Sequence, residues 1–189
     1  KLYNYKFPDN MKHLELTRDR FCFCCLTSLR HSDLDILRRA NFDNPTDPTR
    51  ISFVSKKTND GLTIFLVPEA IELYKKYISI PTGGLAFPKK SNQKMNKGLK
   101  EIAKMLDFTR EVEVMQYCGK TPVYRTAPLC EVIGTHAARR TFVVHALEEG
   151  MSPEMVMTFT GHADYDTMKP YIALTDKKRQ SALLDSFRM

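Results

Sequence analysis

Residues 134–143 read GTHAARRTFV, and this stretch predicts a helix with a strongly basic first turn. Thr135 can cap the helix, and His136, Arg139 and Arg140 then lie on one face at positions i, i+3 and i+4. Positive charge in a first turn opposes the helix dipole and costs about 0.3–1 kcal/mol for each exposed cation. A bound anion would offset that cost, because helix N-termini attract phosphate. The stretch therefore fits either a solvated basic turn or an anion-binding helix end.

On both sides of this stretch the chain reads as mostly helical. Apolar residues recur at helical spacing, Ser, Thr and Pro stand at the expected helix starts, and Gly stands at several expected ends. Four expected helices span residues 17–29, 135–149, 167–173 and 177–187. Three more begin at Ser32, Pro68 and Ser91, with the two serines as caps, and another runs from Ser152-Pro153 to Gly161.

Two stretches favour β-structure instead. Residues 51–57 and 62–67 are rich in β-branched and aromatic residues, and Asp60-Gly61 between them is a hairpin turn signal. Residues 110–130 show a weaker pattern, and a second hairpin and a long loop both fit. The predicted fold class is α+β, a mostly helical single domain with one or two small antiparallel β-hairpins.

The charge of the chain bears on its partners. The 189 residues carry a formal net charge of +7, with a sequence pI of about 9.1. Lys and Arg displace counterions from phosphates, so a basic excess favours a polyanionic partner, although such a charge can also merely keep a domain soluble. No apolar run approaches the ~20 residues that span a bilayer, which excludes a membrane-spanning protein.

The N-terminus and the cysteines bear on origin and compartment. Residues 1–10 lack the apolar region of a signal peptide, and the sequence does not begin with Met, so we expect a fragment of a longer protein. The five cysteines are odd in number and form no CxxC pair, and three crowd the apolar stretch FCFCCL at 21–26. Neither a disulfide framework nor a zinc site is indicated, and we expect a reducing compartment, the cytoplasm.

Several polar residues can carry chemistry, and each also has an ordinary structural interpretation. Arg30 at a helix junction needs an acidic partner such as Asp33 or an anionic ligand. Lys57 ends a strand, where lysines are usually just solvent-exposed, and His162 after Gly161 can be a cap or a packing residue. Tyr171 can be a half-buried packing residue, and as a nucleophile it would need nearby cations or a base, since its unperturbed pKa is about 10.

Together these residues resemble the tyrosine recombinases, the phage-type integrases. The matching segments are Arg30 in TSLRHSDL, Lys57 in KKT, His136 and Arg139 in THAARRTF, His162 in TGHADYDTM, and Tyr171 nine residues after His162. Their order, spacing and apolar surroundings match from about Thr17 to Phe187, although Ser28 stands where the family often has Gly. SNQKMN at 91–96 and GTHAARRTFV look like integrases of Bacteroides-type mobile elements.

The resemblance implies a site-specific recombinase that cuts and rejoins DNA strands through a 3′-phosphotyrosine intermediate, without ATP, cofactor or metal. Tyr171 would be the nucleophile, Arg30 and Arg139 would grip phosphate oxygens, His136 would act as general base or acid, and His162 would donate to a phosphate oxygen. Lys57 would protonate the leaving 5′-oxygen, and Asp33 would support Arg30 or His136.

The resemblance also implies partners and a domain layout. The partner would be double-stranded DNA. The protein would assemble on it as a homo-tetramer, with the C-terminal tail joining neighbouring protomers. Accessory DNA-bending proteins are further candidate partners, and no membrane is involved. Leu183, Leu184 and Phe187 suit docking on a neighbouring protomer and suit packing in cis equally well. Residues 1–12 would be a linker from a missing N-terminal core-binding domain, and 13–189 the catalytic domain.

Two other functions compete with this one. A type IB topoisomerase shares the tyrosine chemistry but relaxes supercoils as a monomer, and a DNA-binding regulator on the same fold does not cut. The sequence context favours the recombinase over the topoisomerase. The presence of all six chemical positions argues against the regulator, because a binder has no need for Tyr171 and Lys57 together.

Overall fold

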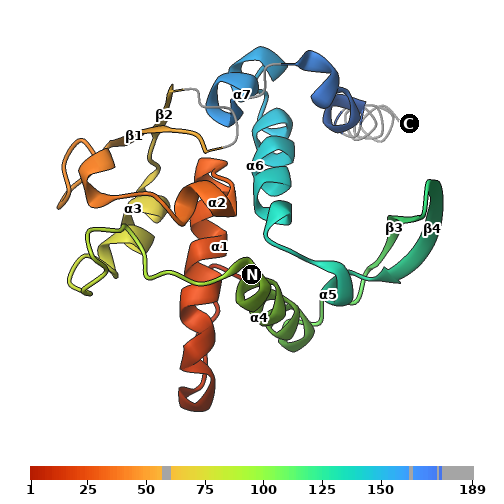
Figure 1. The fold of residues 1–189 in the computed structure, drawn as a ribbon, viewed down its shortest axis with the longest axis horizontal. Helices are drawn as coiled ribbons and strands as arrows, with labels where there is room; N and C mark the ends of the chain where they lie inside the picture. Colours follow the sequence, from red (N-terminus) through yellow and green to blue (C-terminus); the bar gives the residue numbers. More distant parts are fainter. Residues whose placement is uncertain (57–60, 162–163, 174, 176–189) are drawn as a thin grey trace, which may run out of the picture.

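Helix α1 (Glu15–Thr27) runs through the middle of the molecule, and other elements pack around it (Figure 1). The computed structural model describes residues 1–56, 61–161, 164–173 and 175. Helices α3, α4 and α6 all contact α1, whose central stretch Phe21–Cys24 is buried. The apolar run predicted as a helix therefore forms the centre of the main hydrophobic core.

The elements follow the predicted order, with boundaries shifted by a few residues. The helices are α1, α2 (His31–Leu34), α3 (Pro68–Lys75), α4 (Asn92–Met105), α5 (Leu129–Val132), α6 (His136–Glu148) and α7 (Pro153–Thr160), with 3-10 turns at Asp9–Leu14, Arg39–Asn41 and Tyr165–Thr167. The strands are β1 (Arg50–Val54), β2 (Gly61–Phe65), β3 (Glu111–Cys118) and β4 (Thr121–Pro128). Residues 169–173 are also helical, whereas the helix expected at 177–187 lies outside the described residues.

Hairpin β1–β2 packs against the core. Ile51 pairs with Ile64 in an antiparallel register, and both side chains are buried, as is Phe53. Exposed and buried residues alternate along β1, as expected for a strand with one solvated face. The predicted hairpin is confirmed, although its turn, residues 57–60, lies outside the described part of the chain.

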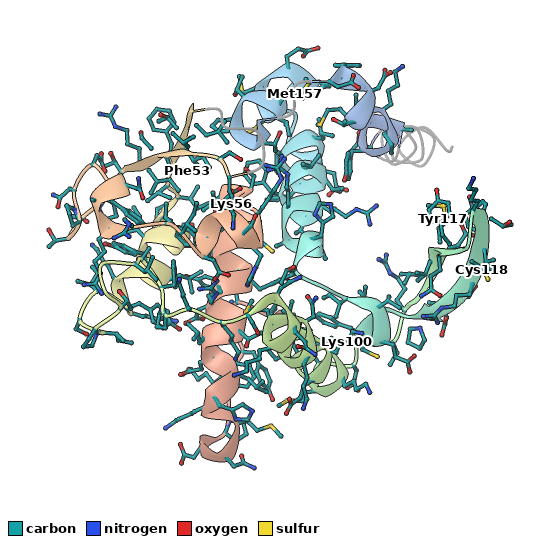
Figure 2. The ribbon with its side chains drawn as sticks, in the orientation of Figure 1. Phe53, Lys56, Lys100, Tyr117, Cys118 and Met157 are labelled. Atoms are coloured by element: carbon teal, nitrogen blue, oxygen red, sulfur yellow. The ribbon has the colours of Figure 1, made fainter. Side chains whose placement is uncertain are left out.

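Residues 110–130, for which a loop and a hairpin both fitted, form the longer hairpin β3–β4. The pair projects away from the helices (Figure 1), and Tyr117 and Cys118 lie at its outer end (Figure 2). Most of its side chains are exposed, and only Ala127 is buried. It is joined to the body through α5, which contacts both strands and α4.

The helix starts follow the predicted capping chemistry in two places and depart from it in two others. Ser91 accepts a hydrogen bond from the Lys94 backbone N–H, and Ser152 accepts one from Met155. Ser32 does not cap α2, because Arg30 stands at the N-cap. Thr135 occupies the N-cap of α6 but its side chain caps nothing, and its hydroxyl donates to α4 instead.

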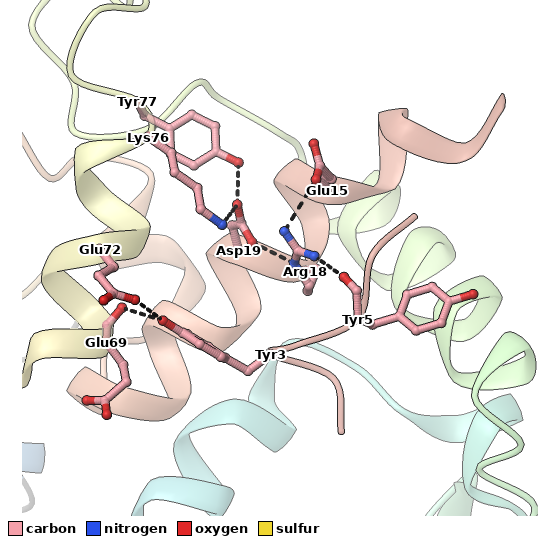
Figure 3. Close-up of polar contacts among 9 residues, drawn as sticks. All are labelled: Tyr3, Tyr5, Glu15, Arg18, Asp19, Glu69, Glu72, Lys76 and Tyr77. Atoms are coloured by element: carbon pink, nitrogen blue, oxygen red, sulfur yellow. Dashed lines mark hydrogen bonds and ion pairs between the residues drawn. The ribbon is translucent and has the colours of Figure 1, made fainter. Parts of the chain in front are cut away.

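Polar contacts around the buried Asp19 and at the surface of α3 tie the N-terminal arm to the body (Figure 3). Asp19 on α1 is buried and accepts hydrogen bonds from Arg18 at 2.7 Å and from the Tyr77 hydroxyl at 2.9 Å. Arg18 also donates to the backbone carbonyl of Tyr5, and the Tyr3 hydroxyl donates to Glu72 on α3 at 2.9 Å. Residues 1–7 therefore lie against α1 and α3.

A second, smaller core joins α6 to α7 and to the segment that carries Tyr171. Its buried members are Val143, Ala146, Leu147, Val156 and Met168, and Tyr171 packs against it. Within the described residues, no helix combines the length and apolar character needed to cross a membrane. The observed architecture is the predicted mostly helical α+β arrangement with two small antiparallel sheets.

Candidate functional site

A pocket of about 270 Å³ lies where the α1–α2 connection and the first turns of α4 and α6 meet. Its lining includes two arginines and two histidines from these three places, which lie far apart in the sequence. The lining residues are Leu29, Arg30, His31, Ser32, Asn92, Thr135, His136 and Arg139. The basic first turn of α6 therefore opens into a cavity, which favours the anion-binding interpretation over a solvated turn.

Arg139 is held at the back of the pocket by backbone carbonyls. It is only 4% exposed, and its Nη1 donates to the Ser28 carbonyl at 3.1 Å while its Nη2 donates to the Thr160 carbonyl. Thr160 ends α7 and Ser28 follows the last residue of α1, so the partially negative ends of two helices face the guanidinium. The arrangement offsets part of the cost of burying this charge.

Burial, and to a lesser degree the nearby positive charge of Arg30, together lower the pKa of Arg139 to about 10. Desolvation and a like charge both disfavour the protonated form. A pKa of about 10 still leaves the group charged at neutral pH. The two arginines thus place two positive charges close together, and an anion between them would relieve their repulsion.

Arg30 is the less satisfied of the two arginines. Its Nη1 is buried and makes no hydrogen bond within the described part of the chain. The nearest acidic atom is Oδ2 of Asp33, 3.9 Å away, which is beyond hydrogen-bond distance. Buried donors without partners are rare in proteins and call for an explanation, and a ligand oxygen in the pocket would supply the missing partner.

Asp33 connects the pocket to the packed hairpin. The carboxylate is almost fully buried, with one oxygen toward Arg30 and the other accepting the Lys56 backbone N–H at 3.0 Å. Lys56, labelled in Figure 2, comes two residues after β1 ends. Asp33 thus lies between Arg30 and the end of β1, and it fixes the chain directly before Lys57.

His136 and Tyr171 stand in different surroundings. His136 lines the pocket and also a neighbouring groove of about 660 Å³ that includes Arg110 and Arg140. Tyr171 lines a separate groove of about 760 Å³ that it shares with Arg140, and it is not among the residues that line the pocket. Two groups oppose the effects of burial and of Arg30 on the pKa of Arg139: Asp33 raises it, and Tyr171 raises it by less.

The structure therefore gathers part of the predicted site. Arg30, His136 and Arg139 line one pocket, Asp33 lies 3.9 Å from Arg30, and Tyr171 lines another groove. Lys57 and His162 lie outside the described residues. Asn92 lines the pocket although the sequence reasoning assigned it no role, and the available signal was its place one residue after the Ser91 cap, in the first turn of α4.

No group of three or more His, Cys, Asp or Glu side chains suited to a metal ion occurs among the described residues. The polar lining of the pocket consists instead of two arginines, two imidazoles, one amide and two hydroxyls. Such groups bind anions, because each offers hydrogen-bond donors.

Comparisons with known proteins identify the family and the fold of this chain. The model of the phage integrase family matches residues 4–178, and no curated protein matches the chain. Among solved structures, XerA recombinase is 15% identical with a TM-score of 0.60, over 98% of this chain and 65% of that one. XerH site-specific recombinase, solved with a palindromic difH substrate, is 14% identical with a TM-score of 0.65, over 96% and 48%.

A further similar structure is the integrase of the Tn1549 transposon, solved in complex with a circular intermediate DNA. It is 15% identical with a TM-score of 0.56, over 86% of this chain and 58% of that one. The chain thus spans about half to two thirds of the length of these structures. At such low identity the similarity concerns the fold, and it confirms the predicted tyrosine recombinase catalytic-domain fold. Because the family model covers almost the whole sequence, the chain belongs to the phage integrase family.

Proposed function

We propose that this chain is the catalytic domain of a site-specific tyrosine recombinase that cuts and rejoins double-stranded DNA through Tyr171. The observation that carries the proposal is the pocket in which Arg30 and Arg139 converge beside His136 at the start of α6. A buried guanidinium donor without a partner on Arg30 and an adjacent buried Arg139 suit a phosphodiester, whose two non-bridging oxygens accept hydrogen bonds from planar guanidinium groups.

In the first step the Tyr171 oxygen attacks the scissile phosphorus, a 3′-phosphotyrosine bond forms, and the bond to the 5′-oxygen breaks. Arg30 and Arg139 stabilise the negative charge that grows on the phosphoryl oxygens, an interaction whose loss commonly costs about 10²–10³ in rate. His136 takes up the phenolic proton, and Lys57 delivers a proton to the leaving 5′-oxygen. His162 donates a hydrogen bond to a phosphoryl oxygen.

In the second step a 5′-hydroxyl from another strand attacks the phosphotyrosine and releases Tyr171. The steps mirror each other, so the phosphodiester energy is conserved in the protein–DNA bond. Tyr171 lines a groove next to the pocket, and cleavage requires its hydroxyl to reach the phosphate held by Arg30 and Arg139. We expect DNA binding to bring the segment 169–173 to that position.

The assembly around this chemistry belongs to the same proposal. The chain acts on double-stranded DNA as a homo-tetramer, held through the residues after Tyr171, with accessory DNA-bending proteins assisting. Residues 1–12 lead from an N-terminal core-binding domain, and Tyr3 and Tyr5 hold this arm against α1 and α3. The protein acts in the cytoplasm and derives from a mobile element of the Bacteroides type, a placement that rests on SNQKMN at 91–96 and GTHAARRTFV at 134–143.

The test is covalent trapping of the protein on a nicked suicide duplex that carries the end of the parent element. Wild-type protein, assayed as this chain and within the full-length natural protein, should give a protein–DNA band that resists denaturant. Tyr171→Phe should bind DNA equally but give no band, because phenylalanine lacks the attacking oxygen. Tyr165→Phe is the matched control, an exposed tyrosine six residues earlier, and it should behave as wild type.

Shifted DNA that never becomes covalent with any of the three proteins would contradict the proposal and favour a binding-only regulator.

A further inference from the structure

We propose that Asn96 on α4 is a positioning residue for His136, acting through Thr135, the residue directly before it. The inference rests on the proposed function, in which His136 moves a proton at the pocket. Asn96 itself is not among the residues that line the pocket, so it acts on the reaction only through its neighbour.

Two side chains of α4 hold Thr135. The Thr135 backbone N–H donates to Asn96 Oδ1 at 2.9 Å, and the Thr135 hydroxyl donates to Asn92 Oδ1 at 2.8 Å. Asn92 and Asn96 are four residues apart within α4, and therefore lie on one face of that helix. The residue that precedes His136 is thus fixed at both its backbone and its side chain.

The close approach of Asn96 depends on Gly134. A Cβ added to Gly134 would lie 3.2 Å from Asn96 Oδ1, which is tighter than ordinary van der Waals contact. The absence of a side chain at Gly134 lets the chain that leads into α6 lie against α4. Gly134, Asn96 and Thr135 therefore form one contact at the entrance to α6.

This contact matters at the start of α6 rather than for the helix as a whole. The later part of α6 is anchored by the buried side chains of Val143 and Leu147. The Thr135 side chain makes no capping hydrogen bond to the first turn, and the start of α6 is held instead by the two hydrogen bonds that Thr135 donates to α4. Loss of the tie would leave α6 folded but would let His136 shift relative to Arg30 and Arg139, and a misplacement of about 1 Å can cost ~100-fold in rate.

The test compares variants of Asn96 that differ in one property. Asn96→Leu has nearly the same size but no acceptor, and Asn96→Asp keeps an acceptor oxygen for the Thr135 N–H. Single-turnover cleavage at saturating suicide duplex should fall by about 10- to 100-fold in Asn96→Leu. It should stay within about threefold of wild type in Asn96→Asp, since an acceptor oxygen remains there. The Kd for DNA and the Tm of Asn96→Leu should stay close to wild type, because neither the core nor the lining of the pocket changes.

A pH–rate profile separates positioning from general structural damage. One limb of the pH–rate profile should report His136, and His136→Ala identifies it as the limb that disappears. That limb should shrink in Asn96→Leu and persist in Asn96→Asp. Gly134→Ala provides an independent route to the same defect, because its Cβ would press on Asn96 Oδ1, and it should reproduce the profile of Asn96→Leu.

Wild-type cleavage by Asn96→Leu, or an equal loss in Asn96→Leu and Asn96→Asp, would overturn the inference. So would a slow Asn96→Leu that keeps the full His136-dependent limb. These outcomes leave the proposed function intact as long as wild-type protein forms the Tyr171-dependent covalent band, whereas failure of that band in wild type would contradict the proposed function itself.

Discussion

The two hairpins of this molecule are built from similar residues but stand in opposite surroundings. In β1–β2, alternate side chains such as Ile51, Phe53 and Ile64 are buried in the main core. In β3–β4, Val123 and Tyr124 are about half exposed, at 48% and 59%, and the pair projects from the body (Figure 1). A strand pair made of β-branched and aromatic residues is thus not necessarily a core element.

The two hairpins also differ in how they are connected to the pocket that Arg30 and Arg139 line. The end of β1–β2 is fixed to the pocket, because Asp33 binds the backbone of Lys56 and faces Arg30. In β3–β4, Val112 and Val114 line the groove beside His136, but no residue of either strand lines the pocket of the two arginines. We infer that the packed hairpin holds catalytic geometry and that the projecting one does not.

The largest effect on stability is expected from a cavity in the core beneath β1–β2. Ile51→Ala removes a fully buried side chain and should lower the free energy of unfolding by about 2–5 kcal/mol, since it leaves a cavity. Val123→Ala in β4 is the matched control and should change it by less than about 0.5 kcal/mol. Denaturant unfolding of both variants measures the contrast, and equal costs would show that both hairpins are core elements.

A smaller effect is expected at the connection between β1–β2 and the pocket. Asp33→Ala removes the acceptor of the Lys56 N–H and the negative charge beside Arg30, and should cost about 1–3 kcal/mol of stability. Asp33→Asn keeps an acceptor oxygen but loses the charge, and should cost less stability than Asp33→Ala.

Both Asp33 variants should cleave the suicide duplex at least about 10-fold more slowly in single-turnover assays, because Arg30 loses its orientation. Wild-type cleavage by either variant would show that the connection through Asp33 has no role in the chemistry.

The smallest effect on the fold is expected from shortening β3–β4. Glu113 and Thr126 are paired across the hairpin, so replacing residues 114–125 by Asn-Gly leaves a tight turn of the type that two-residue hairpins favour. The Tm should change by only a few degrees, which corresponds to about 1 kcal/mol. A cooperative unfolding transition lowered by more than about 10 °C would place this hairpin in the core after all.

Parts of the fold that depend on local patterns were predictable from the sequence. The β-branched and aromatic residues in 51–57 and 62–67, with Asp60-Gly61 between them, predicted β1–β2, and the Ser91 and Ser152 starts predicted caps that the structure confirms. Residues 110–130 stayed ambiguous for a physical reason. Neither face of β3–β4 packs against the core along its length, so selection for a clean alternation of apolar and polar residues is absent.

The capping role of Thr135 was predicted wrongly because a neighbour from another helix decides it. The hydroxyl of Thr135 can bond its own helix or a distant partner, and in the fold it donates to Asn92, 43 residues away. Ser32 also fails to cap α2, because that helix begins earlier, with Arg30 at its N-cap. Local chemistry identifies residues able to cap, and tertiary contacts select among them.

At the site, the family resemblance implied that Arg30, His136 and Arg139 act on one phosphate, and in the structure these three residues line one pocket. The groups that hold Arg139 are backbone carbonyls of Ser28 and Thr160, and backbone carbonyls have no sequence signature. Ser28 adopts a left-handed conformation with φ of 59°, which accounts for a glycine preference at that position. Its hydroxyl also donates to the Phe159 carbonyl at 2.8 Å, a contact that glycine cannot make.

The most direct measurement is to identify the residue that carries DNA in the trapped complex. Wild-type protein would be reacted with the nicked suicide duplex, digested with protease and nuclease, and the nucleotide-bearing peptide sequenced by mass spectrometry. The account predicts a nucleotide joined through its 3′-phosphate to Tyr171. A nucleotide on any other residue, or a bound complex that yields no modified peptide, would contradict it.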